Sequence, residues 1–60
     1  MKIATAGSKE SLQKIINEYF YSHNYIITDD LKIFNTSKNS FLDGFEVIIK
    51  NSRWIFKESK

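Results

Sequence analysis

Residues 45–57, FEVIIKNSRWIFK, constrain the fold of this chain more than any other stretch. They predict two strands joined by a two-residue turn at Asn51-Ser52, although that pair lacks the glycine that a type I′ turn prefers. Because side chains alternate between the two faces of a strand, the hairpin has one apolar face and one mixed face. The apolar face carries Phe45, Val47, Ile49, Trp54 and Phe56, and the mixed face carries Glu46, Ile48, Lys50, Arg53, Ile55 and Lys57.

A helix predicted over residues 8–22 supplies a layer that covers the apolar face of the hairpin. Ser8 follows Gly7 and is the expected N-cap. One helical stripe holds Leu12, Ile15, Ile16, Tyr19 and Phe20 at the spacing of a buried face. The opposite, polar face holds Glu10, Gln13, Lys14, Asn17 and Glu18. Tyr21 points away from the stripe, so it is either exposed or covered by something outside the helix.

The remaining segments predict a short strand over residues 2–6 and a second hairpin around Asp29-Asp30. A two-residue loop would pair Tyr25 with Phe34, whereas a four-residue loop would pair Ile27 with Phe34. Either register leaves apolar groups on both faces, so a partner is one candidate to cover the second face. Residues 35–44 form the predicted loop, with Phe41 and Leu42 tucked under the sheet edge.

These elements predict an α+β fold with the chain order β-α-β-β-β-β. One amphipathic helix packs on one face of a mainly antiparallel sheet built from two hairpins, in a single domain over residues 1–60. Stability must come from apolar packing, because the chain has no cysteine for a disulfide and one histidine offers no obvious structural zinc site. Small chains often gain stability by self-association, so a homodimer is a second expectation.

The charge balance is only mildly basic, with nine basic and seven acidic residues and a formal net charge of +2. A dedicated nucleic-acid binder is usually more basic, and a chain with eight lysines and one arginine would read base sequence weakly. No run is long and apolar enough for a membrane span, and the N-terminus does not resemble a signal peptide. The expected location is the cytoplasm.

No motif indicates catalysis, a metal or a cofactor. His23 is the natural general base, but a histidine at the end of a helix also interacts favourably with the helix dipole. The pair Asp29-Asp30 lacks the further ligands of a calcium loop and suits a hairpin turn. Residues 4–8 have one glycine and match no phosphate-binding loop, so ordinary capping explains them. We therefore predict a protein that is not an enzyme.

The leading functional hypothesis is a binding or accessory module that contacts a protein, with inhibition and self-association as its two candidate roles. Tyr21, Ile48 and Ile55 are the candidate contact residues. The alternative hypothesis is a weakly selective nucleic-acid binder that uses Lys50, Arg53 and Lys57. A bacterial or phage accessory factor would suit this composition. The helix followed by three strands is superficially similar to the first part of a double-stranded-RNA-binding domain, but the second, basic helix is absent and that function is not assigned.

Overall fold

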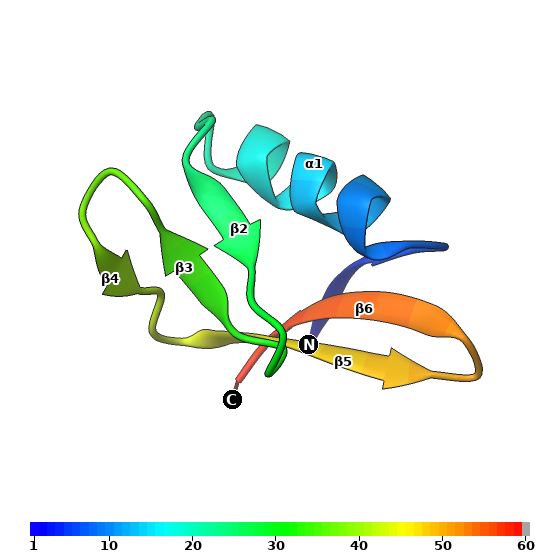
Figure 1. Cartoon of the computed structure of the whole chain (residues 1–60). Coiled ribbons are helices and arrows are strands. Elements are labelled where there is room, and N and C mark those ends of the chain that lie inside the picture. Colours follow the sequence, from blue (N-terminus) through cyan, green and yellow to red (C-terminus); the bar gives the residue numbers. More distant parts are fainter. Residues whose placement is uncertain (60) are drawn as a thin grey trace.

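The computed structural model describes residues 1–59, which form one helix and six strands in two antiparallel three-stranded sheets (Figure 1). Sheet A has the order β1 (Lys2–Ala6), β6 (Arg53–Glu58), β5 (Phe45–Lys50), and sheet B has the order β2 (Tyr25–Ile27), β3 (Ile33–Asn35), β4 (Ser40–Phe41). The predicted α+β class is confirmed. The structure adds the short strand β4 and divides the strands between two sheets.

The β5–β6 hairpin has the predicted register, with Lys50 opposite Arg53 and Ile48 opposite Ile55. Asn51 and Ser52 have φ angles of 52° and 63°, the left-handed values that a type I′ turn requires at both central positions. The turn therefore forms without glycine, because the type I′ twist matches the twist of the two strands.

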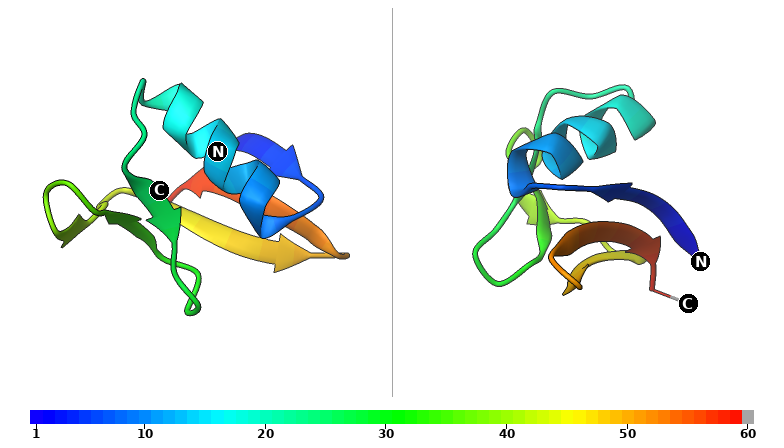
Figure 2. Two further views of the ribbon diagram at one scale, coloured as in Figure 1. Left: turned by 45° about the horizontal axis from the view of Figure 1, so that its top comes forward. Right: turned by 90° about the vertical axis from the view of Figure 1, so that its right-hand side faces the viewer.

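Helix α1 (Lys9–Tyr19) begins after the predicted cap, since the Ser8 hydroxyl accepts a hydrogen bond from the Ser11 amide at 3.2 Å. It packs over one face of sheet A, while sheet B closes the side of the core (Figure 2). The buried core cluster comprises Leu12, Ile16, Ile27, Ile33, Val47 and Phe56. The core therefore draws on the helix and both sheets.

The structure departs at three places from the side-chain pattern expected of a regular strand or helix. Tyr19 belongs to the predicted stripe but is 49% exposed, because the helix ends at this residue. Ile49 lies on the predicted apolar face and is also 49% exposed, since the hairpin end extends past the helix (Figure 1). In β1 the register shifts between Lys2 and Ala4, and this bulge lets Ile3 pack against the core together with the alanines.

Neither register considered for the second hairpin occurs. Ile26 pairs with Phe34 and Ile27 with Ile33, so five residues connect the strands. Thr28 closes this connection, because its amide donates to the Lys32 carbonyl at 2.8 Å and its hydroxyl accepts from the Lys32 amide at 3.0 Å. The odd loop length places Ile27 and Ile33 together on the core face, and Ile26 and Phe34 on the outer face.

Part of the polar face of α1 binds the backbone of β2. The Asn17 amide nitrogen donates to the Tyr25 carbonyl at 2.9 Å, and the Asn17 carbonyl accepts from the Tyr25 amide at 2.8 Å. Gln13 accepts from the Ile27 amide at 3.1 Å. Two helix side chains thus occupy the free edge of β2, where another strand would otherwise bind.

Candidate functional site

The outer face of sheet A, opposite the helix, holds the predicted contact pair Ile48 and Ile55. The two side chains lie directly opposite each other on β5 and β6, and Thr5 of β1 continues the row beside Ile55. Both isoleucines are half-buried, although in the described part of the chain no helix covers this face. The structure therefore brings these two candidates together in the middle of an uncovered sheet face.

The three basic candidates on the same face differ in whether they have an acidic partner. Lys57 forms an ion pair with Glu46 at 3.3 Å, across the strands. Lys50 and Arg53 face each other at the exposed end of the hairpin, and within residues 1–59 neither forms an ion pair. Like charges directly opposite each other destabilise a sheet. The positive charge of this face is thus concentrated at Lys50 and Arg53.

The aromatic residues of the hairpin lie on its other face, toward the helix. Phe56 is fully buried and Trp54 is half-buried against the core. Phe45 stacks on Phe56 with ring centroids 5.5 Å apart. Within residues 1–59 the basic face consequently offers isoleucines and no aromatic ring beside its cations, whereas surfaces that bind single strands usually stack bases on aromatic side chains.

Tyr21, the third contact candidate, lies just beyond the C-terminal end of α1, on the helix side of the molecule. Its side chain is 98% exposed and its φ angle is 52°. The Tyr21 amide donates to Glu18 and the Ser22 amide donates to Asn17, which is the pattern of a Schellman motif with Tyr21 at C′. Glycine is the usual residue at this left-handed position. The local fold therefore gains nothing from the tyrosine side chain.

An apolar row whose residues were not among the predicted contact candidates crosses the outer face of sheet B. Ile26, Phe34 and Phe41 lie side by side on β2, β3 and β4. The rings of Phe34 and Phe41 meet edge to face with centroids 5.1 Å apart. Ile26 is 38% and Phe41 is 54% exposed, so Phe41 is not tucked under the sheet edge as predicted, whereas Leu42 packs against the core. We call these three residues the sheet B row.

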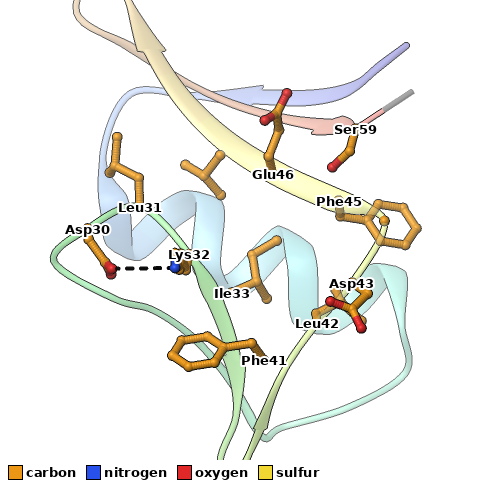
Figure 3. Close-up of a pocket in the computed structure, with 12 residues that line it drawn as sticks. Asp30, Leu31, Lys32, Ile33, Phe41, Leu42, Asp43, Phe45, Glu46 and Ser59 are labelled. Atoms are coloured by element: carbon orange, nitrogen blue, oxygen red, sulfur yellow. Dashed lines mark ion pairs between the residues drawn. The ribbon is translucent and has the colours of Figure 1, made fainter.

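A groove of about 600 Å³ lies between the Asp30–Ile33 segment and the beginning of β5 (Figure 3). Its apolar lining includes Ile33, Leu42 and Val47. Its charged lining is mostly acidic, comprising Asp30, Asp43 and Glu46 with the single cation Lys32 among the described residues. Asp30 pairs with Lys32 at 4.0 Å, as the dashed line in Figure 3 marks.

The Thr28–Lys32 connection also lowers the pKa of the Asp30 carboxyl. The Thr28 hydroxyl donates a hydrogen bond to the Asp30 carboxylate. This bond, assisted by the charge of Lys32, holds the pKa of the Asp30 carboxyl below its ordinary value of 3.8. Asp29 lies beside it, fully exposed, and pairs with Lys9 at 3.7 Å. Asp30 thus forms its contacts within the connection between the strands, and Asp29 contacts the start of the helix.

The structure does not assemble a recognisable catalytic group around His23. His23 is exposed in the loop after the helix. Within residues 1–59, no three histidine, cysteine or acidic side chains lie close enough together to hold a metal ion. The expectation that the protein is not an enzyme and needs no cofactor stays a prediction. In the same residues, no helix has the length and apolar character needed to cross a membrane.

Comparisons of the chain with protein-family models, with curated proteins and with solved structures gave no match. The functional argument therefore rests on the surfaces described above.

Proposed function

We propose that this protein is a binding module that acts by contact with another protein, and that the sheet B row is its contact surface. The observation that carries the proposal is the exposure of Ile26 and Phe41 in one continuous cross-strand row with Phe34. Apolar residues gathered on an uncovered face are typical of protein interaction sites, and aromatic side chains contribute much of the binding energy there.

The surroundings of the row also suit a protein interface. The Lys32 ammonium lies 5.5 Å from the centre of the Phe41 ring, and Thr36 is exposed beside the end of β3. An apolar centre with polar groups at its rim is the usual organisation of such interfaces. The partner that fits this row is a protein surface that is itself apolar at its centre, with an acidic group placed to meet Lys32.

Affinity capture with matched variants tests the proposal. The tagged wild-type protein, the Phe41→Ser variant and the Ile49→Ser variant are each used to capture partners from extracts of the producing cells. Ile49 is a suitable control because it is 49% exposed, close to the 54% of Phe41, and lies on sheet A. We expect one protein to be retained by the wild type and by Ile49→Ser, and to be lost with Phe41→Ser. Retention by all three would contradict the proposal.

The captured protein then allows a direct map of the surface. In NMR titrations of the labelled chain, the amides of β2, β3 and β4 should shift most when the partner is added. A salt titration of the same complex separates the nucleic-acid alternative, because contacts between lysines and phosphates weaken steeply as salt rises. Binding through the apolar row should change little with salt. Steep loss of affinity, with shifts at Lys50 and Arg53, would favour the alternative.

A further inference from the structure

Sheet B has two edges, and the chain itself covers only one of them. Gln13 and Asn17 bind the backbone along β2. The other edge is β4, which lies at the end of the molecule with no described helix or strand beyond it (Figure 1, Figure 2). Ser40 and Phe41 are both exposed. An edge of this kind is open to pairing with a further strand.

The hydrogen bonds of sheet B show which backbone groups of β4 point outward. The Ile27 amide points away from β3, toward the helix. Because bonded and non-bonded pairs alternate along antiparallel strands, Phe34 bonds β2 and its two neighbours in β3 bond β4. The Leu42 amide agrees with this alternation, since it donates to the Ile33 carbonyl at 2.8 Å. The amide and carbonyl of Phe41 therefore point away from sheet B.

The strand β4 has only two residues, but hydrogen bonds on both sides fix its position. Before it, the Asn35 side-chain carbonyl accepts from the Ser37 and Lys38 amides, each at 2.9 Å, and so fixes the turn into β4. After it, the Leu42 amide binds β3 and the Leu42 side chain packs against the core. The edge is thus extended before a partner binds, which lowers the entropy cost of binding.

Asp43 follows Phe41 by two positions and adds a charge to this edge. Residues two positions apart in an extended chain direct their side chains to the same side. Phe41 and Asp43 accordingly both line the groove shown in Figure 3. Asp43 is exposed, and among residues 1–59 it forms no ion pair. The edge therefore offers unpaired backbone groups at Phe41 and a carboxylate two positions further on.

We propose that the protein partner adds an extended strand to the edge of β4, with an apolar residue facing Phe41 and a basic residue, two positions away, facing Asp43. This inference rests on the sheet B row as the contact surface and names the class of segment that the row receives. The apolar residue lengthens the row beyond Phe41, and its backbone exchanges hydrogen bonds with the Phe41 backbone. The basic residue matches Asp43 by charge.

A peptide with both features tests the inference by NMR titration of the labelled protein. The probe is acetyl-Thr-Arg-Thr-Ile-Thr-amide, in which isoleucine and arginine stand two positions apart. In an antiparallel pairing with isoleucine opposite Phe41, arginine lies opposite Asp43. We expect saturable shifts of the β4 and Asp43 amides, with a dissociation constant of about 1 mM. No saturable shift up to about 10 mM peptide overturns the inference.

Methylation of the peptide backbone separates strand pairing from side-chain contact. A methyl group on the isoleucine nitrogen removes the amide that donates to the Phe41 carbonyl, so saturable binding should be lost. A methyl group on the central threonine nitrogen points away from β4, so the affinity should stay within about threefold of the unmodified probe. Both methylated peptides have the same side chains. Equal affinities for the two methylated peptides overturn the inference.

The Asp43→Asn variant tests the charged contact. It should weaken the arginine peptide by about fivefold, whereas a peptide with uncharged citrulline in place of arginine should bind the variant and the wild type alike. Glu10→Gln removes an exposed carboxylate from the start of α1 and should leave the affinity unchanged. Asp43 is exposed, so the thermal midpoint of Asp43→Asn should stay close to that of the wild type. Binding of the arginine peptide that is unaffected by Asp43→Asn overturns the inference.

The capture experiment with Phe41→Ser distinguishes this inference from the function on which it rests. A partner that is captured only when Phe41 is present, together with a peptide that does not bind, contradicts the added strand and leaves the sheet B row as the contact surface. A partner that Phe41→Ser captures as well as the wild type does contradicts the contact surface itself.

Discussion

Asn17 binds the backbone of Tyr25 from the middle of the helix, as a neighbouring strand would. Its side-chain amide both accepts from the Tyr25 amide at 2.8 Å and donates to the Tyr25 carbonyl at 2.9 Å. The nitrogen also donates to the Gln13 carbonyl at 3.0 Å. One side chain thus fixes the position of β2 relative to α1, and with it the position of sheet B over the core.

Replacement of Asn17 by aspartate should lower the free energy of unfolding by about 2 kcal/mol. The carboxylate keeps the contact with the Tyr25 amide but cannot donate to the Tyr25 carbonyl, which is left facing a negative charge. Chemical denaturation measures the change, and amide hydrogen exchange should show faster opening at Tyr25 and Ile27. Glu18→Ala on the exposed side of the same helix should alter stability by less than about 0.5 kcal/mol. Equal effects for the two substitutions would contradict the role given to Asn17.

The sequence was sufficient to predict the β5–β6 hairpin but not the β2–β3 register. In the β5–β6 hairpin, strict alternation and opposite charges at Glu46 and Lys57 select one pairing. In the β2–β3 hairpin, apolar residues occur on both faces, so alternation does not discriminate between registers. The decisive feature is a five-residue connection in which Leu31 has a φ angle of 62°, and leucine gives no sign of a left-handed conformation.

Some residues of the candidate surfaces could be predicted from the sequence, and others could not. The pairing of Ile48 with Ile55 followed from the strand period, whereas the helix period left Tyr21 either exposed or covered, and the structure shows it exposed. The sheet B row was missed because its residues align only in the true register and across β4, which has two residues. Its one available signal was the apolar character of both faces of the 25–35 segment. The edge contacts of Gln13 and Asn17 were missed because polar residues on a polar helix face are usually solvated.

The type I′ turn of the β5–β6 hairpin should become more stable when Ser52 is replaced by glycine. Ser52 has a φ angle of 63°, which is unfavourable for a residue with a Cβ atom and free of strain for glycine. We expect the free energy of unfolding to rise by about 0.5–1 kcal/mol, because the relieved left-handed strain exceeds the extra chain entropy that glycine loses on folding. Asn51→Gly should give a smaller gain, because asparagine tolerates the left-handed region better. Thermal unfolding of the two variants gives the comparison, and a destabilised Ser52→Gly variant would argue against the turn geometry.

The lowered pKa of Asp30 gives a pH dependence with a definite sign. Because the folded-state pKa lies below 3.8, the Thr28–Asp30 contact stabilises the protein fully above the unfolded pKa, and this contribution is lost as the pH falls through the folded pKa. An NMR titration of the Asp30 carboxyl carbon measures that value. Thr28→Val removes the hydroxyl donor and should raise the pKa of Asp30. Thr28→Ser keeps the donor and should leave it lowered, so an equal rise in both variants would exclude the hydroxyl as the cause.

Tyr21 should oppose stability and support binding, because its left-handed backbone favours glycine while its side chain is 98% exposed. Tyr21→Gly is expected to raise the free energy of unfolding by about 1 kcal/mol, which corresponds to about 4–8 °C in the thermal midpoint. Tyr21→Ala removes the same ring without relieving the backbone, so its stability should stay close to the wild type. If Tyr21 contacts the protein partner, both variants should weaken that complex by about tenfold, as measured by titration calorimetry. A glycine variant that is more stable and binds as well as the wild type would exclude Tyr21 as an additional contact residue outside the sheet B row.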